Sequence, residues 1–359
     1  MMKIAFIVRS SFYSSPGGDT IQAEFTAKYL RKLQLEVDIK LTSEQIDYSS
    51  YQLIHFFNLI RPADILPHIK NNIPYVISSI YVDYSFYKSH QSGILYKSIL
   101  KYFSPNNLEY TKTIGRWLLN GSERPHINYI LKGHRKSIVH ILKNAAFILP
   151  NSYSELTRIK ATFGSYAPME IIPNGIDTEL FQPDNGIARN PYQVICVGRI
   201  ETRKNQLNLI RALNNSSYEL VIIGKPSPNH YNYYSKCKSE AKGNIHFINE
   251  MPQSDLHYHY ASAKVHALPS FFETTGLSSL EAAYLGCNIV ITDKGDTSEY
   301  FGNHGFYCEP DDPASIYQAV DRAAKMPVNH SFQLQIDKHY TWSKAALLTK
   351  NVYHKILSA

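Results

Sequence analysis

The sequence lacks the patterns of a disulfide-linked, zinc-binding or membrane-spanning protein. It has four cysteines in 359 residues, with no CxxC pair, so neither a disulfide framework nor a cysteine zinc site is expected. Its histidines show no ligand spacing with cysteine or carboxylate, and no run approaches the roughly 20 apolar residues of a membrane span. The opening MMKIAFIV has no small-residue cleavage site after it and predicts a first β-strand, not a signal peptide. We therefore expect a soluble cytoplasmic protein.

The chain is long and apolar enough for two domains with sizeable cores. Hydrophobic residues make up 44% of it and charged residues 19%, which excludes disordered, collagen-like and coiled-coil chains. The formal net charge is +7. Residues 81–145 contain ten basic and three acidic residues, whereas the rest of the chain has 27 of each. A surplus confined to one segment indicates an anionic partner.

Short apolar runs alternate with helical patterns along nearly the whole chain, which predicts parallel sheets covered by helices on both faces. We predict an α/β protein with two doubly wound, Rossmann-like domains facing a cleft, with ligands beyond the carboxyl ends of the strands. The expected strands are Lys3–Val8, Leu35–Leu41, Leu53–Phe57, Tyr75–Ser79, Ala146–Pro150, Glu170–Pro173, Val194–Val197, Leu220–Ile223, Ile245–Ile248, Val265–Leu268 and Ile289–Thr292.

The domain boundaries are placed at an irregular stretch rich in glycine and proline. We expect a first domain in residues 1–173, a linker in 174–191 and a second domain in 192–339. The final helix, residues 340–359, has no strand after it and is expected to pack back towards the first domain.

A glycine pair follows the first predicted strand. Gly17 and Gly18 leave the backbone bare at the start of a helix, where a phosphate or sugar can approach. The spacing is not GxGxxG, so a dinucleotide-binding site is not indicated. The alternative is a plain turn with Asp19 or Thr20 as the helix cap.

A cationic loop follows the first strand of the second domain. Gly198 is followed by Arg199 and, after Arg203, by Lys204. A guanidinium fork and a point charge at the end of a strand suit a diphosphate. The alternative is a solvated loop in which these cations pair with Glu201.

Two carboxylates flank the expected start of a helix near Gly276. Glu273 follows a strand, and Glu281 lies more than one turn inside the helix. Carboxylates accept hydrogen bonds from vicinal hydroxyls, and a helix start offers N–H groups to a phosphate. A ligand with a sugar, a diphosphate and a ribose would satisfy all three features.

Together these motifs resemble the retaining glycosyltransferases of the GT-B fold, in particular glycosyltransferase family 4, the group 1 glycosyl transferases. Glu273 and Glu281 form the E-x7-E pattern of that family. The likeness is dense over residues 145–359 and thin over 81–145. Further matches are Ile172–Asp177, Val197–Ile200 with Lys204, Pro269–Ser270, Gly286, Gly295 with Glu299, and Pro310–Pro313.

The resemblance implies an enzyme that transfers a hexosyl group from a nucleotide-diphosphate sugar to a glycan or lipid-linked glycan, in cell-surface polysaccharide synthesis. Arg199 and Lys204 would hold the diphosphate, Glu273 the donor sugar and Glu281 the ribose. Other donor-binding positions would be Gly198, the backbone of Thr275, Gly276 and Leu277, and Gly17 and Gly18 from the first, acceptor-side domain. The leaving diphosphate takes the acceptor proton, so no cofactor and no metal are expected.

One position departs from the family pattern. Many relatives carry a histidine shortly after the strand that here begins behind Pro74, and this chain has Ile80 there. The hydrogen bond usually given to the donor sugar would then come from Asp83 or His55. For His55 the alternative is a packed core histidine, and for Asp83 it is a turn residue.

The basic segment, residues 81–145, also carries apolar residues at helical spacing. Cationic amphipathic helices lie on anionic membranes, where each basic residue contributes about 1 kcal/mol. We predict a lipid-linked or otherwise anionic acceptor and a peripheral position on the inner face of the membrane. The alternative is a solvated helical face. No nucleic-acid partner is expected, because no base-reading module is present.

Other functions stay open at this point. One is a nucleotide-sugar epimerase of the same fold, and another is a nucleotide-sugar-binding subunit without activity. Ile80 favours the second, whereas the joint presence of Arg199, Lys204, Glu273 and Glu281 favours a transferase.

Overall fold

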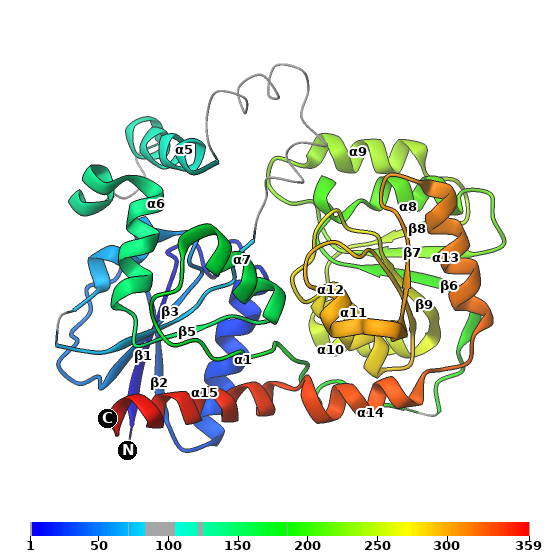
Figure 1. Cartoon of the computed structure of the whole chain (residues 1–359). Coiled ribbons are helices and arrows are strands. Elements are labelled where there is room, and N and C mark those ends of the chain that lie inside the picture. Colours follow the sequence, from blue (N-terminus) through cyan, green and yellow to red (C-terminus); the bar gives the residue numbers. More distant parts are fainter. Residues whose placement is uncertain (1, 71, 83–104, 121–124, 185, 359) are drawn as a thin grey trace. The chain divides into compact units, whose positions relative to one another are not determined.

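The computed structural model describes residues 2–70, 72–82, 105–120, 125–184 and 186–358. The chain divides into two compact units, drawn in Figure 1. The first contains Met1–Pro173 and Trp342–Ala359, and the second contains Asn174–Thr341.

The first unit is built on a five-stranded parallel sheet of order β2-β1-β3-β4-β5. The strand order reverses between β1 and β3, which makes their carboxyl ends the expected place for a ligand. The strands are β1 (Lys3–Val8), β2 (Glu36–Leu41), β3 (Leu53–Phe57), β4 (Tyr75–Ser78) and β5 (Phe147–Leu149). The helices are α1 (Gly18–Lys32), α2 (Pro62–Ile65), α5 (Pro105–Asn120), α6 (Ile127–Asn144), α7 (Tyr153–Phe163) and α15 (Trp342–Leu357).

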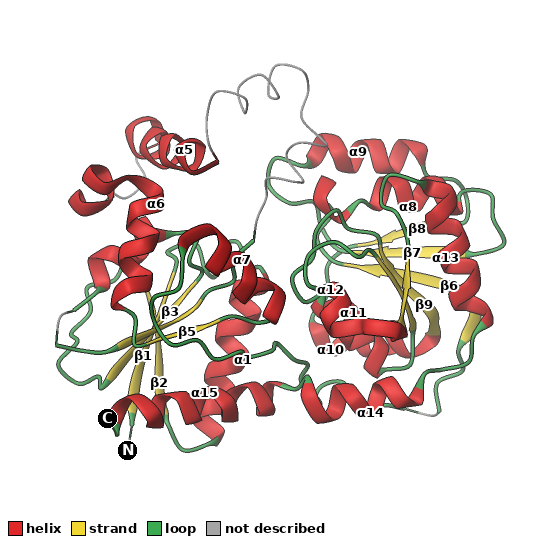
Figure 2. Cartoon of the chain, in the orientation of Figure 1, coloured by secondary structure: helices red, strands yellow, loops and turns green. Residues whose placement is uncertain are grey.

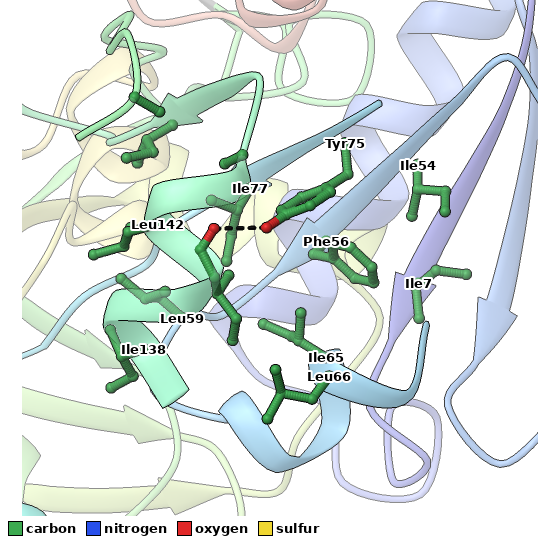
Figure 3. Packing of buried hydrophobic residues seen from close by; sticks show 14 of the residues in the cluster. Ile7, Ile54, Phe56, Leu59, Ile65, Leu66, Tyr75, Ile77, Ile138 and Leu142 are labelled. Atoms are coloured by element: carbon green, nitrogen blue, oxygen red, sulfur yellow. Dashed lines mark hydrogen bonds between the residues drawn. The ribbon is translucent and has the colours of Figure 1, made fainter. Parts of the chain in front are cut away.

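The core of the first unit lies between the sheet and the helices that follow its strands, as Figure 3 shows. β3 is completely buried and carries four apolar residues and His55, as expected for a central parallel strand. Phe56 packs edge to face with Tyr75 of the neighbouring strand, their ring centroids 5.4 Å apart. The Tyr75 hydroxyl donates to the carbonyl of Ile141 at 2.6 Å, which ties α6 to β4.

The second unit has a six-stranded parallel sheet of order β11-β10-β9-β6-β7-β8. Figure 2 shows its strands in yellow. They are β6 (Asn190–Val197), β7 (Glu219–Ile223), β8 (Ile245–Ile248), β9 (Ala263–Leu268), β10 (Asn288–Ile291) and β11 (Gly305–Tyr307). The helices are α8 (Gln206–Leu213), α9 (Tyr231–Glu240), α10 (Gln253–Ser262), α11 (Leu277–Tyr284), α12 (Thr297–Phe301), α13 (Pro313–Lys325) and α14 (His330–His339). The predicted α/β class with two doubly wound parallel sheets is confirmed.

The segment predicted as a linker, residues 174–191, is part of the second unit. Its apolar residues Ile176 and Phe181 are each 1% exposed in the core of that unit. Ile176 also forms a parallel bridge with Thr341. The glycines and prolines of this segment therefore mark a packed, irregular chain rather than a free connection.

The predicted strand Glu170–Pro173 is not formed. The segment runs beside β5, where the Glu170 N–H donates to the Ile148 carbonyl at 3.1 Å and the Ile172 N–H to the Pro150 carbonyl at 2.9 Å. Pro150 has no N–H to donate to the Glu170 carbonyl between these two bonds, so a continuous ladder cannot form.

The final helix, α15, belongs to the first unit. It packs along α1, where the Trp342 ring stacks on Phe25 with centroids 5.7 Å apart. The Lys350 ammonium donates to the Leu33 carbonyl at 3.0 Å, just after the end of α1.

Candidate functional site

The predicted site residues of the second unit gather at one edge of its sheet. The strand order reverses between β6 and β9, which are hydrogen-bonded neighbours. The cationic loop follows β6, and the loop with Glu273 follows β9. The fold therefore places both at the switch point where doubly wound sheets bind ligands.

The cationic loop is anchored at its base and at its end. Gly198 has φ 149° and Gly224 has φ 151°, and a Cβ on Gly224 would collide with the Gly198 carbonyl. At the start of α8, the Asn205 side chain donates to the carbonyls of Pro269 and Pro310 at 2.9 and 2.7 Å. The loop after β6 is thus tied to the segments that follow β9 and β11.

The backbone of Glu273 is held by the loop after β10. Its N–H donates to the Lys294 carbonyl at 3.1 Å, and its carbonyl accepts from the Asp296 N–H at 2.9 Å. Gly295, with φ 98°, allows this approach, because a Cβ there would collide with the Glu273 carbonyl. The glycine that the sequence has at position 295 is therefore required for steric reasons.

The Glu273 carboxylate is buried and contacts two cations. Lys204 Nζ lies 2.6 Å and Arg203 Nη1 lies 3.4 Å from the same oxygen, Oε1. Burial alone would raise the pKa of Glu273, but the charges of Lys204 and Arg203 outweigh it and hold the pKa below its ordinary value. Burial lowers the pKa of Lys204, and the Glu273 charge opposes that shift. Both groups therefore stay charged at neutral pH as an ion pair.

Sequence reasoning gave Arg203 no role, yet it links two carboxylates. Its Nη2 donates to Glu201 Oε1 at 2.8 Å, and its Nη1 donates to the Phe272 carbonyl at 2.8 Å. Arg199 is more open, with 41% of its side chain exposed and Glu201 at 3.6 Å. A run of three cations around one acid was visible in the sequence, but which cation faces inward was not.

Glu281 is buried inside α11. The Tyr260 hydroxyl donates to its Oε2 at 3.0 Å, and the Gln253 amide donates to Oε1 at 3.1 Å. Burial raises the pKa of Glu281 to about 8 despite these donors. Gln253 and Tyr260 lie on α10 and were not predicted, because no spacing in the sequence links them to Glu281.

The segment between the two glutamates turns into α11 at Gly276, which has φ 72°. The Thr275 hydroxyl accepts a hydrogen bond from the Asn174 amide at 3.1 Å. The N–H groups of Ser279 and Leu280 donate to the Gly276 carbonyl at 2.9 and 3.0 Å. Those of Leu277 and Ser278 come before this first helical hydrogen bond, in the position that suits an anion.

The glycine pair lies in the first unit, where Gly17 is the N-cap of α1 and Gly18 is exposed. Asp19 is not the cap that one alternative proposed. It pairs with Arg9 at 2.7 Å, and Arg9 also donates to the Ser15 carbonyl at 2.7 Å, so this arginine holds both ends of the glycine turn.

A small pocket lies at the switch point of the first sheet, beyond β1 and β3. Asn58 has φ 73°, and within the described residues its buried Oδ1 has no hydrogen-bond partner. The pocket is lined by Val8, Arg9, Phe12, Asp19, Phe57 and Asn58.

The sugar contact proposed for His55 is not supported, because this residue is 1% exposed. Its Nδ1 lies 2.5 Å from the Tyr353 hydroxyl and its Nε2 lies 2.9 Å from Ser78 Oγ. Burial lowers the pKa of His55 to about 3, so it is a neutral core histidine. Asp83 lies outside the described residues. Ile80 has φ 45°, unusual for a β-branched side chain.

Residues 177–339 match the family model described as "Glycosyl transferases group 1". The matched segment lies within the second unit and covers less than half of the chain. Within this segment, Arg199, Lys204 and Glu273 lie in loops and Glu281 lies in α11.

Known proteins resemble this chain over different lengths. The D-inositol 3-phosphate glycosyltransferase of Pseudarthrobacter chlorophenolicus is 25% identical over 263 residues, which is 66% of this chain and 61% of that protein. The chain spans about half the length of the curated relatives that it matches.

Solved structures match the fold along the whole chain. Sucrose-phosphate synthase from Thermosynechococcus elongatus has a TM-score of 0.74 at 14% identity, with 100% of both chains covered. HepE of Anabaena in complex with UDP-glucose has a TM-score of 0.70 at 14% identity, again with 100% of both chains covered. The predicted GT-B fold is confirmed.

Two further properties concern the described part of the chain. No helix there is both long and apolar enough to cross a bilayer. No three His, Cys, Asp or Glu side chains there gather as metal ligands.

Proposed function

We propose that this chain is a retaining glycosyltransferase that moves a sugar from a nucleotide-diphosphate donor to a glycan or lipid-linked glycan, in cell-surface polysaccharide synthesis. The observation that carries the proposal is the buried Lys204–Glu273 ion pair at the switch point of the second sheet. The pair lies within the segment that matches the group 1 family. The UDP-glucose complex of HepE, which has the same fold, supports a uridine-diphosphate sugar as the first donor to test.

In this proposal the donor diphosphate lies at the start of α11, facing the N–H groups of Leu277 and Ser278 and the positive end of the helix. Exposed Arg199 and buried Lys204 contact different phosphate oxygens. Glu273 accepts hydrogen bonds from sugar hydroxyls and Glu281 from ribose hydroxyls. These cations stabilise the charge that develops on the leaving diphosphate, so transfer proceeds without a bound metal.

The first unit supplies the acceptor side in this proposal. Its pocket beyond β1 and β3 combines aromatic walls, Phe12 and Phe57, with the unpartnered acceptor atom of Asn58. The pocket has a volume of about 10 Å³, which is room for a single hydroxyl group or water. A hydroxyl group of an acceptor sugar would satisfy the Asn58 carbonyl.

A thermal-shift screen of UDP-, GDP- and ADP-sugars tests the donor assignment. A ligand at 100 times its Kd stabilises the folded state by about 2.7 kcal/mol, so the cognate donor raises Tm and the others do not. We expect the Glu273→Ala variant to lose turnover of the donor. Glu240→Gln, which changes an exposed carboxylate on α9 paired with Arg211, keeps it. If no nucleotide sugar shifts Tm, the proposed function is wrong.

Ile80 is the feature behind the second candidate, a donor-binding subunit without activity. The family resemblance leads us to expect a histidine at this position, and Ile80 has φ 45°, which is unusual for a β-branched residue. Donor hydrolysis separates the two candidates. A transferase releases nucleoside diphosphate slowly without acceptor, whereas a binding subunit raises Tm with donor and releases none under any condition.

We also propose that α6 lies against an anionic membrane surface. Ile127 and Leu131 are 52% and 76% exposed, one helical turn apart. The same helix carries three cations around a kink at Gly133, with Lys132 before it and Arg135 and Lys136 after it. The apolar pair would enter the lipid interface and the cations would contact headgroups. The described part of the basic segment thus supports peripheral membrane association.

Vesicle sedimentation tests this contact with phosphatidylglycerol and phosphatidylcholine vesicles. We expect binding to the anionic vesicles at low salt and its loss at high salt. Lys136→Glu weakens binding, whereas Lys236→Glu, the same charge change on exposed α9 of the second unit, leaves it intact. Equal binding to both vesicle types would contradict the electrostatic contact.

A further inference from the structure

Glu201 lies at the centre of a chain of charged groups that joins three strand ends of the second sheet. It is in the loop after β6 and is 8% exposed. The hydroxyl of Ser227, in the loop after β7, donates to its Oε2 at 2.9 Å. On its other oxygen, Oε1, it accepts from Arg203 at 2.8 Å. Burial would raise the pKa of Glu201, but Arg203 and Arg199 bring it down to about 2.

Arg203 extends this chain to the loop after β9. One terminal nitrogen contacts Glu201, while the other donates to the Phe272 carbonyl and lies 3.4 Å from Glu273 Oε1. The Arg203 carbonyl accepts from the Phe271 N–H at 2.8 Å, so backbone and side chain hold the same segment. A planar guanidinium can bridge two carboxylates in this way, whereas a lysine ammonium cannot reproduce the fork.

Arg199 stands apart from this clamp. Its side chain is twice as exposed as that of Arg203, at 41% against 20%, and within the described residues its ion contact is Glu201 at 3.6 Å. Glu201 therefore orients the exposed cation without consuming its hydrogen-bonding capacity. The two arginines have different tasks: Arg203 is internal, and Arg199 is available to an anion.

We propose that Glu201 is a positioning residue for sugar transfer, acting through Arg203 on the Glu273 carboxylate and through Arg199 on the diphosphate. The inference rests on the proposed glycosyl transfer. Glu201 restrains the two arginines and lowers the positive charge that a diphosphate meets. Its removal therefore increases the positive charge that a diphosphate meets but lets Glu273 shift from the place where it meets the sugar.

This role predicts opposite changes in binding and turnover. In Glu201→Gln, UDP, GDP or ADP, whichever the wild type binds, binds as tightly as before or tighter in calorimetry, because one negative charge is gone. Turnover of the matching nucleotide sugar falls about tenfold. In Glu201→Ala, which also loses the shape of the side chain, it falls on the order of 100-fold, the effect of misplacing a reacting group by about 1 Å. A purely structural role would weaken binding and turnover together.

Two further variants locate the effect. Arg203→Lys keeps the charge but loses the bridge, so its turnover falls as in Glu201→Ala. Glu240→Gln removes a carboxylate that pairs with Arg211 at 2.6 Å on the exposed side of the same unit, and it changes neither readout. If Glu201→Gln leaves turnover unchanged, or lowers affinity and turnover in parallel, the positioning role is overturned.

The clamp is also measurable without activity. Glu201 and Glu273 share Arg203, so the Tm changes of Glu201→Gln and Glu273→Gln are expected to be non-additive in the double variant. Absence of nucleotide binding in the wild type would refute the proposed function, whereas additive Tm changes would refute the clamp. The two failures are therefore distinguishable.

Discussion

The two sheets have the same kind of switch point but hold different chemistry there. In the second unit, Arg203 and Lys204 meet the buried carboxylate of Glu273 beyond β6 and β9. In the first unit, Arg9 and Asp19 form one ion pair beside an aromatic-walled pocket beyond β1 and β3. In each unit the strand order determines where a ligand can bind, and the side chains of the loops determine which charge that ligand must carry. We infer that the second unit binds the anionic part of the donor and the first unit a neutral, hydroxyl-rich group.

The largest effect is expected from Lys204→Met. Removing Lys204 from this buried ion pair leaves Glu273 with the more distant Arg203 cation, at a cost of about 3 kcal/mol in unfolding free energy. Turnover falls on the order of 1000-fold, because the leaving diphosphate loses its buried cation. Chemical denaturation and donor turnover measure the two effects.

The matched control is Arg211→Met. Its partner Glu240 is exposed, so this change lowers the unfolding free energy by no more than about 1 kcal/mol and leaves turnover unchanged. If Lys204→Met and Arg211→Met lowered the unfolding free energy equally, burial of the Lys204–Glu273 pair would add nothing to stability.

A second effect concerns the backbone at Glu273. Gly295→Ala places a Cβ against the Glu273 carbonyl at φ 98°. Gly302→Ala also has a positive φ, 43°, but nothing lies within 4 Å of the new Cβ. We expect Gly295→Ala to cost about 2 kcal/mol more than the control and to reduce turnover, because Glu273 must move. Similar melting temperatures for the two variants would contradict the steric role of Gly295.

The buried carboxyl of Glu281 makes stability depend on pH. Its pKa is raised from 4.5 to about 8, so between these values the folded state holds a proton that the unfolded state has released. Stability contributed by Glu281 is therefore present at low pH and declines as pH rises through this window, by at most about 1.4 kcal/mol per pH unit. Denaturation from pH 5 to 8 measures it. Glu281→Gln has a shallower slope, and identical slopes would contradict the raised pKa.

The smallest effect is expected from Asn58→Gly in the first unit. Glycine accepts φ 73° and removes the buried Oδ1 without a partner, so stability changes within about 1 kcal/mol. Calorimetric affinity for UDP stays the same, while KM for the acceptor rises. A weakened UDP affinity would show that the first pocket also serves the anionic group and would end the contrast between the two units.

Local sequence patterns predicted the helices and strands of the fold well. A run such as Leu53–Phe57, in which His55 is the one polar residue, favours a buried parallel strand where helices alternate with such runs. The strand predicted at Glu170–Pro173 did not form, because Pro150 beside it has no N–H to donate. The patterns also failed in residues 174–191, where glycine and proline indicated a linker and the buried Ile176 and Phe181 show packing instead.

The site was predictable only in part for a related reason. Glu273, Glu281, Arg199 and Lys204 stand at strand ends or helix starts, which the sequence marks. No sequence pattern identifies the hydrogen-bond and ion-pair partners of these residues. Tyr260 reaches Glu281 from another helix, and the fork of Arg203 takes its meaning from two carboxylates 72 residues apart in the chain.

The sequence by itself determined the class of fold, the two strand series and the charged residues that follow the strands, because these depend on local periodicity and on composition. The tertiary structure alone decided that His55 is a neutral core residue, that Arg203 faces inward while Arg199 stays exposed, and that Glu281 holds a proton near neutral pH. Burial and pairing between distant segments set these properties, and neither is encoded in the spacing of neighbouring residues.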